Sequence, residues 1–260
     1  MGARALTEEP AAEAGARGIA PRGLRRVAIV PAHNEQGNVG RVVREILAVD
    51  PELDVVVVDD GSVDRTAAEA AEAGATVVRL PFNLGIGGAV QTGFRYAFEH
   101  GYELAVRLDG DAQHDPTQLD RLVAPVLAGE ADIAVGSRFL SPSGYRPPFA
   151  RRIGIAVFAK VVSLLVRSRV TDTTSGFQAL NRRAIALFAA DYPHDYPEVE
   201  ATLMVFKHTL TLTEVPVTMR ERGGGASSIT ALRSVYYAVK VLLAVFVGAL
   251  RRNVTPLQER

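Results

Sequence analysis

The first half of the chain alternates short, almost wholly apolar runs with longer segments in which apolar residues recur every three or four positions. Arg26–Pro31 and Asp54–Asp59 are two such apolar runs, and Val39–Val49 between them has helical spacing. Runs without a polar face are typical of parallel strands that are buried on both faces. The alternation therefore predicts an α/β fold with a mainly parallel, doubly wound central sheet flanked by helices.

The same alternation continues along the chain and becomes less regular in its second half. Helices are expected over Asp64–Ala73 and Gly87–His100, and further strands over Thr76–Leu80, Glu103–Leu108, Asp132–Gly136 and Leu210–Val217. Ligands of such sheets bind at the carboxyl ends of the strands. The chemistry is therefore expected at three polar segments that follow strands: Pro31–Glu35, Asp59–Gly61 and Asp109–His114.

The amino-acid composition excludes several kinds of site and binding surface. The chain has no cysteine, which excludes disulfides, thiol catalysis and thiolate metal sites and leaves hard cations such as Mg²⁺ or Mn²⁺. Lys plus Arg and Asp plus Glu both number 29, so a uniformly basic surface for nucleic acid is not expected. Residues 1–23 lack the apolar core of a signal peptide. We expect them to form a disordered tail and the catalytic part to stay in the cytoplasm.

The segment Leu108–His114 reads LDGDAQH and follows an expected strand. Alternate residues of an extended chain point to the same side, so Asp109 and Asp111 can converge on one cation, with Gln113 as a third oxygen ligand. A divalent ion there can bridge the phosphates of a nucleoside diphosphate and stabilise the leaving group. The alternative is a polar turn that caps the helix expected near Pro116, which Asp115 could do by itself.

Two other polar segments leave similar alternatives open. Asp60 can accept hydrogen bonds from a base or a ribose, or the segment can be a turn with Ser62 or Asp64 as the helix cap. The triplet that begins at His33 can contact a nucleotide or cap the next helix, and a lone histidine is more often structural. The glycine-rich Asn83–Gly88 lacks the spacing and the Lys-Ser/Thr ending of phosphate loops, and close packing explains it equally well.

Taken in order, these segments resemble the family 2 glycosyltransferases with the GT-A fold, above all the dolichol- and polyprenyl-phosphate mannosyl- and glucosyltransferases. The resemblance covers about residues 25–228, so that 24–228 would be the GT-A domain. It rests on seven motifs: VPAHNE (30–35), VVDDGS (57–62), NLGIGGA (83–89), LDGDAQHDP (108–116), GSRF (136–139), DTTSGFQAL (172–180) and EVPVTMRERGGGASS (214–228).

The resemblance implies transfer of a hexose, with inversion, from GDP- or UDP-hexose to a polyprenyl or dolichyl phosphate. It implies that the base and ribose pocket contains Pro31, His33, Glu35 and Asp60. Asp109, Asp111 and Gln113 match the metal site, Asp109 also faces the donor, and Arg138 matches a position near the donor phosphates. The acceptor side would contain Ser175, Gly176, Arg222 and Ser227, with Arg222 counted among the catalytic residues; the family's following lysine is replaced by Ser228.

The type of acceptor decides whether a general base is needed. A phosphate monoester is already anionic, whereas a sugar hydroxyl needs a base, for which Glu198 or Glu200 would be the candidate. Two rival functions follow: extension of a polysaccharide or glycolipid at a hydroxyl, and a catalytically silent protein that binds nucleotide sugars. The intact pair Asp109 and Asp111 argues against the second rival.

Two basic, apolar stretches favour a lipid acceptor: Arg151–Arg169 and Arg233–Arg252. The apolar run between Lys240 and Arg251 is shorter than the ~20 residues that a spanning helix needs. We therefore expect residues 229–260 to form an amphipathic, membrane-interfacial helix and tail, and the protein to bind peripherally at the cytoplasmic face of the membrane. The alternative is a helix that packs on the domain, on a membrane-protein partner or on a second copy of the chain.

Overall fold

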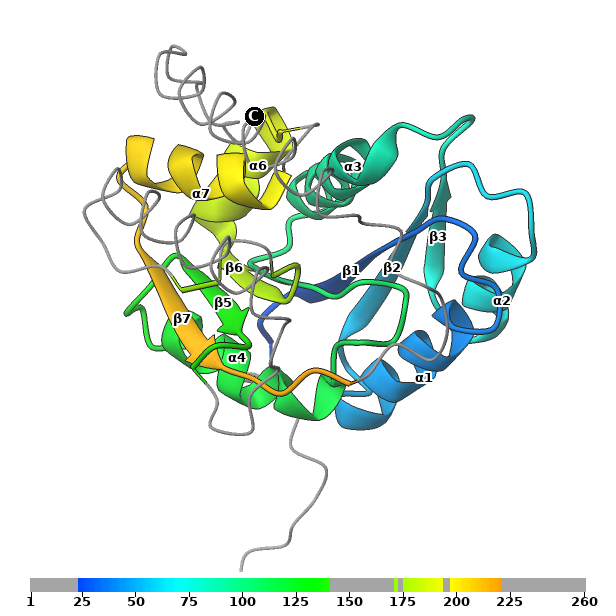
Figure 1. Cartoon of the computed structure of the whole chain (residues 1–260), viewed down its shortest axis with the longest axis horizontal. Coiled ribbons are helices and arrows are strands. Elements are labelled where there is room, and N and C mark those ends of the chain that lie inside the picture. Colours follow the sequence, from blue (N-terminus) through cyan, green and yellow to red (C-terminus); the bar gives the residue numbers. More distant parts are fainter. Residues whose placement is uncertain (1–22, 141–170, 173–174, 194–196, 221–260) are drawn as a thin grey trace, which may run out of the picture.

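The computed structural model describes residues 23–140, 171–172, 175–193 and 197–220, which form a seven-stranded sheet between two layers of helices (Figure 1). The strand order is β3-β2-β1-β4-β6-β5-β7. The strands are β1 (Arg26–Ala32), β2 (Asp54–Asp59), β3 (Thr76–Arg79), β4 (Leu104–Arg107), β5 (Ile133–Ser137), β6 (Gln178–Asn181) and β7 (Leu212–Pro216). The mixed α/β architecture with a mainly parallel sheet is thus confirmed.

One strand runs against the others. β6 lies between β4 and β5 and is antiparallel to both, while the remaining neighbours pair in parallel. Its register places Gln178 opposite Arg107. Because β6 runs in the opposite direction, the segment that leads into it lies at the edge where the parallel strands end. This strand was not predicted from the sequence. Its direction brings residues 175–177 to the edge of the sheet where the chemistry is expected.

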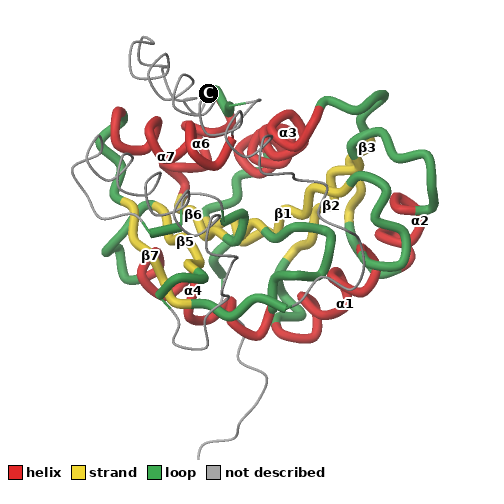
Figure 2. Tube along the Cα trace, in the orientation of Figure 1, coloured by secondary structure: helices red, strands yellow, loops and turns green. Residues whose placement is uncertain are grey.

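The helices cover both faces of the sheet, as Figures 1 and 2 show. The helices α1 (Val39–Val49), α2 (Thr66–Glu72) and α4 (Leu119–Leu127), the last preceded by the 3₁₀ turn η1 (Pro116–Gln118), cover one face. The helices α3 (Gly85–Glu99), α6 (Arg182–Ala190) and α7 (Pro197–Lys207) cover the other. Each layer has its own cluster of buried apolar side chains, so the sheet is buried on both faces.

The predicted elements of the first half are found with small shifts at their ends. The helix Val39–Val49 has the predicted bounds because its apolar spacing buries Val42, Val43 and Ile46 against the sheet. Asp115 caps η1 through the amide of Thr117, as the alternative for that segment anticipated. In contrast, α6 was not predicted, because Ala184–Ala189 are all buried and leave no polar face to mark a helix.

Several expectations concern residues outside this description: the disordered tail, the stretch Arg151–Arg169 and the C-terminal segment from residue 229 onward. They remain predictions. In the described part of the chain, no helix is long and apolar enough to cross a membrane.

Candidate active site at the carboxyl edge of the sheet

The loop after β4 gathers the carboxylates that the sequence singled out. Ala112 has a φ of 62°, a left-handed conformation that is uncommon for a residue with a side chain. This turn brings Gln113 back to Asp111, whose carboxylate accepts a hydrogen bond from the Gln113 backbone amide (3.1 Å) and a second from its side-chain amide. Two of the three predicted metal ligands therefore lie in contact, directly after Asp109.

Asp109 is held from two sides. On one side, a guanidinium nitrogen of Arg107 lies 3.4 Å from its Oδ1. On the other, the backbone amide of Asp109 donates to Nδ1 of His114 (3.0 Å), so this imidazole carries its proton on Nε2, which lies 3.8 Å from Asp109 Oδ2. The ring of His114 is buried and stacks on Phe177. The carboxylate is thus fixed in one orientation while 37% of its side chain stays exposed.

The charges around Asp109 favour its ionised form. Burial by itself would raise its pKa, but the positive charges around the carboxylate outweigh burial and hold that pKa below its usual value. Burial also lowers the pKa of His114, although the nearby charges of Asp109 and Asp111 act in the opposite direction. The groups that lower the pKa of Asp109 are His114, Arg107 and Arg138, and Arg107 acts both through its charge and through its hydrogen bond.

Gly176 lies directly against the same carboxylate. A Cβ at this position would come within 2.8 Å and 2.9 Å of the two Asp109 oxygens and within 3.1 Å of the Arg107 guanidinium. No residue with a side chain fits there without displacing Asp109. Gly176 therefore brings the motif predicted to face the acceptor, DTTSGFQAL, into direct contact with the motif predicted to face the donor, LDGDAQHDP.

The loop after β1 is held by side chains of the loop after β2 and of the first turn of α2. Four consecutive backbone amides, from residue 34 to residue 37, donate to four side-chain oxygens: Asn34 to Ser62 (2.9 Å), Glu35 to Thr66 (2.8 Å), Gln36 to Asp64 (3.2 Å) and Gly37 to Glu69 (2.6 Å). In dinucleotide-binding sheets the first loop offers its amides to phosphate. Here those amides are engaged by the protein, so this loop presents side chains to a ligand instead.

Asp60 joins this loop to the start of α3. It is only 3% exposed, its Oδ1 accepts the Leu84 amide (2.7 Å), and its carbonyl oxygen accepts Nδ1–H of His33 (2.8 Å). Gly88 leaves no room for a side chain, because a Cβ would lie 2.6 Å from that of Leu84. The glycine-rich segment thus has a packing role, and the Asp60 carboxylate has a structural contact whether or not it also meets the donor.

Replacing Asp60 by alanine is expected to raise the KM for the donor more than it lowers kcat, because a contact made equally in ground and transition states changes KM alone. Steady-state kinetics would measure this split. Asp60→Asn is the matched control: its amide oxygen can still accept the Leu84 amide, so it restores the loop without the charge. A normal KM in Asp60→Ala would leave Asp60 with the structural role only.

Arg138, predicted near the donor phosphates, is bound to Asp172. Its Nε and a terminal nitrogen donate to the two oxygens of that buried carboxylate at 2.7 Å and 2.8 Å. Glu214 of β7 in turn accepts the amides of Thr171 and Asp172. This network fixes residues 171 and 172, where the DTTSGFQAL motif begins, at the end of β5. Ser175 is buried, its hydroxyl accepts the Phe177 amide, and its carbonyl oxygen accepts the side-chain amide of Gln178 in β6.

The structure describes the neighbours of the remaining predicted site residues rather than all of those residues themselves. Arg222 and Ser227 lie outside the described residues. Arg220 is described: its backbone amide donates to the Gln113 carbonyl (2.9 Å), and its guanidinium binds Glu45 and Asp115. The chain is therefore tied, two positions before Arg222, to the loop that contains the predicted metal ligands. Glu200 lies in α7 and already has an interaction partner.

The predicted metal ligands Asp109, Asp111 and Gln113 fit a hard divalent cation. Two carboxylates and one amide supply oxygen ligands of the kind that Mg²⁺ and Mn²⁺ prefer. In this structure the amide nitrogen of Gln113 donates a hydrogen bond to Asp111, so the two side chains are neighbours. Three oxygen ligands leave positions for diphosphate oxygens. No group of three or more acidic and histidine side chains gathers as a metal centre within the described residues.

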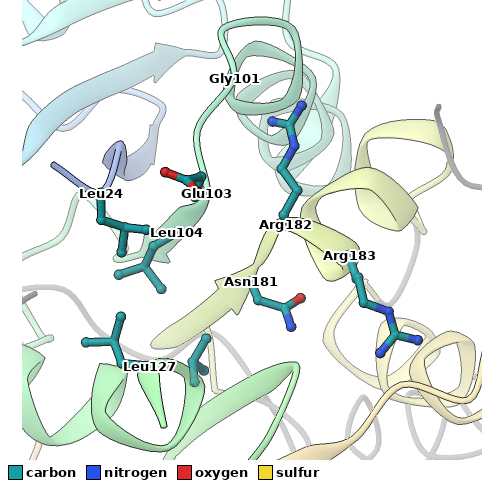
Figure 3. Close-up of a pocket in the computed structure, with 9 residues that line it drawn as sticks. Leu24, Gly101, Glu103, Leu104, Leu127, Asn181, Arg182 and Arg183 are labelled. Carbon is teal, nitrogen blue, oxygen red and sulfur yellow. The ribbon is translucent and has the colours of Figure 1, made fainter. Parts of the chain in front are cut away.

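A cavity of about 460 Å³ lies at the opposite edge of the sheet, near the start of β4 (Figure 3). Its two arginines already have partners: Arg182 donates to the carbonyls of Phe98 and Tyr102, and Arg183 binds Asp132. Figure 3 also shows these two side chains pointing away from each other. Its polar groups do not converge, so we place the chemistry at the carboxyl edge.

Two residues of this site were missed by sequence reasoning. Arg107 is a charged residue at the end of an otherwise apolar strand, and His114 closes the LDGDAQH segment. The position of Arg107 in a buried strand was a usable signal, because an arginine is rarely fully buried without a partner. The partner itself could not be read from the sequence.

Comparisons with known proteins agree with this geometry. The family model described as "Glycosyl transferase family 2" matches residues 27–188. Polyprenol monophosphomannose synthase of Mycolicibacterium smegmatis is 32% identical, over 79% of this chain and 81% of that protein. Undecaprenyl-phosphate mannosyltransferase of Micrococcus luteus is 30% identical, over 80% of this chain and 88% of that protein.

The fold also matches solved structures. Glucosyl-3-phosphoglycerate synthase from Mycobacterium tuberculosis, solved with Mn²⁺, uridine diphosphate and phosphoglyceric acid, superposes with a TM-score of 0.67 over 85% of this chain and 78% of that one, at 21% identity. This likeness confirms the GT-A fold. The match of the family model over residues 27–188, together with the relative that is 32% identical, shows that the chain belongs to glycosyl transferase family 2.

Proposed function

We propose that this protein transfers a hexose, mannose or glucose, from a GDP- or UDP-sugar to a polyprenyl or dolichyl phosphate, with inversion and with the help of Mg²⁺ or Mn²⁺. The observation that carries the proposal is the packing of Gly176 on the Asp109 carboxylate, which joins the acceptor motif to the donor motif. The names of the relatives, which include two polyprenyl-phosphate mannosyltransferases, support the choice of acceptor.

In this proposal the protein mainly positions the reactants. A phosphate monoester is already a nucleophilic anion, so the transfer needs no general base. Asp109, fixed by Arg107 and His114, faces the donor, and Asp60 with His33 orients the base or ribose. A cation held by Asp109, Asp111 and Gln113 would supply charge stabilisation to the leaving diphosphate. Arg222 and Ser227 are assigned to the acceptor phosphate.

Product analysis tests the proposed reaction. The full chain is incubated with labelled GDP-mannose, UDP-glucose or GDP-glucose, a short polyprenyl phosphate and Mn²⁺ or Mg²⁺. The expected product is a lipid-linked monosaccharide that mild acid cleaves, which is typical of a glycosyl phosphate. Transfer only to a glycolipid hydroxyl would favour the polysaccharide- or glycolipid-extending alternative. Donor binding without turnover on either acceptor would favour the silent binding protein.

We also propose that residues 24–228 form the catalytic domain and that residues 229–260 attach it to the cytoplasmic face of the membrane. Each basic residue near an anionic surface adds about 1 kcal/mol of attraction, which salt screens. Sedimentation with anionic liposomes is therefore expected to weaken at high ionic strength and to be lost when the chain ends before Ile229. Equal sedimentation of the shortened and full chains would exclude this segment as the anchor.

A further inference from the structure

The segment that follows β7 runs past α4 toward α1, as Figure 1 shows in orange. We call its residues 216–220 the linking segment. Gln118 of η1 holds it at Thr218 by two hydrogen bonds: the side-chain amide donates to the Thr218 carbonyl (2.7 Å), and the side-chain oxygen accepts the Thr218 amide (2.8 Å). Arg121 of α4 donates to the Pro216 carbonyl (3.3 Å). The linking segment is therefore attached to the elements that follow the loop of predicted metal ligands.

Arg220, at the end of the linking segment, contacts three different parts of the chain. Its backbone amide donates to the Gln113 carbonyl (2.9 Å). One terminal nitrogen of its guanidinium donates to Glu45 of α1, and the other donates to Oδ1 of Asp115 (3.0 Å). The same oxygen of Asp115 accepts the amide and the hydroxyl of Thr117, which caps η1. Arg220 thus joins α1, η1 and the loop of predicted metal ligands at one point.

The ion pairs of Arg220 are largely shielded from solvent. The side chains of Arg220, Glu45 and Asp115 are 32%, 29% and 26% exposed. An isolated ion pair on an open surface contributes little, but one guanidinium shared by two carboxylates forms a network with a defined geometry. This network is therefore able to fix the position of the backbone at residue 220.

We propose that Arg220 is a positioning residue for the transfer reaction. Its pairing with Glu45 and Asp115 holds the linking segment at the Gln113 carbonyl. It thereby sets where the chain enters the element assigned to the acceptor phosphate, whose first assigned residue, Arg222, comes two positions later. The inference rests on the proposed function, because that function assigns Arg222 to the acceptor.

The loss of Arg220 should affect the acceptor and not the donor. Gln113 keeps its two hydrogen bonds to Asp111 without Arg220, so these two predicted metal ligands stay together. An acceptor phosphate held in a displaced position would be misaligned with the donor, and a displacement of about 1 Å can cost ~100-fold in rate. A general loss of structure would instead weaken the binding of donor and acceptor alike.

Two substitutions separate the charge of Arg220 from its geometry. Arg220→Met removes the charge and keeps a long side chain, whereas Arg220→Lys keeps the charge and loses the fork of the guanidinium. The matched control is Arg41→Met, because Arg41 forms the other ion pair of Glu45 (2.7 Å) but belongs to α1 itself and is 55% exposed. Thermal unfolding of each variant checks its fold.

Hydrogen–deuterium exchange of the full chain measures the attachment directly. Arg220→Met should speed the exchange of the amides at residues 218 and 220 by about 10-fold, since local opening exposes them, and Arg41→Met should not. With a short polyprenyl phosphate, Arg220→Met should lower kcat/KM for the acceptor on the order of 10-fold. The donor dissociation constant, measured by calorimetry, should stay unchanged. Arg220→Lys should restore part of the lost kcat/KM.

A double variant tests the ion pair itself. If Arg220 acts through Glu45, the loss of kcat/KM in Arg220→Met with Glu45→Ala is smaller than the product of the two single losses. Single losses that multiply would contradict the inference. Should Arg220→Met not fold, Glu45→Ala alone is measured in the same way, because it removes one of the two carboxylates that hold Arg220.

Two further results would overturn the inference while the proposed function stands. One is wild-type exchange at residues 218 and 220 in Arg220→Met, and the other is an equal fall in donor and acceptor affinity. If the wild-type chain transfers no sugar to polyprenyl phosphate, the proposed function fails first and the inference falls with it.

Discussion

Replacing Asp111 by alanine is expected to abolish metal-dependent donor binding and to lower kcat/KM by roughly 10²–10³-fold, the usual cost of losing one main electrostatic stabiliser. Asp111 lies on the loop after β4, and its carboxylate accepts two hydrogen bonds from Gln113, so its removal takes away one predicted ligand and releases a second. The core does not include this side chain, and the fold should persist.

Calorimetric titration with GDP, UDP and their sugars, with and without Mn²⁺, measures the effect. Asp120→Ala is the matched control, because Asp120 is an exposed carboxylate in the first turn of α4. It should leave donor binding unchanged. If Asp111→Ala binds the donor with wild-type affinity in the presence of Mn²⁺, the metal assignment is wrong.

Adding one methyl group at Gly176 should have the second largest effect. The new Cβ would lie 2.8 Å and 2.9 Å from the Asp109 oxygens, closer than real contacts allow, so Asp109 must move away from its fixed orientation. A displacement of about 1 Å in a positioned group can cost ~100-fold in rate. Gly176→Ala should therefore lower kcat by up to two orders of magnitude and change the KM for polyprenyl phosphate little.

Separate kinetic constants for donor and acceptor distinguish this role from direct acceptor binding. A raised KM for polyprenyl phosphate with a normal kcat would mean that Gly176 serves the acceptor and not Asp109. Gly40→Ala is the control for crowding elsewhere: its Cβ would lie 3.2 Å from the Glu69 carbonyl, far along the chain from Asp109. It can shift the melting temperature but should leave kcat unchanged.

Local patterns were enough to predict the first half of the fold. The runs at β1 and β2 and the spacing of α1 follow from burial on both faces of a sheet, so their positions were readable from single segments. β6 reads QALN and lacks the β-branched runs of β1 and β2, and in α6 the residues 184–189 are all buried, so neither element shows the pattern that marked the others. The antiparallel insertion of β6 depends on pairing with strands far away in the sequence.

In the site, too, local features could be predicted from the sequence and contacts between distant residues could not. Asp109, Asp111 and Gln113 were predictable together because they lie within one loop. The position of the Arg107 guanidinium depends on its hydrogen bond to the hydroxyl of Tyr192, which is 85 positions further along the chain. The need for glycine at position 176 depends on the close approach of Asp109, which only the folded chain defines. The sequence indicated which chemical groups were present, but not which distant groups would hold them.

The four hydrogen bonds that join the loop after β1 to the loop after β2 and to α2 have a consequence for protein engineering. The conformation of residues 34–37 is determined by Ser62, Asp64, Thr66 and Glu69, which lie in a different stretch of the chain. If the first loop alone were transplanted between relatives to exchange nucleotide preference, its four backbone amides would lose their hydrogen-bond acceptors. The transferable module is the first loop together with the loop after β2 and the start of α2, and a chimera needs both segments taken from the same parent.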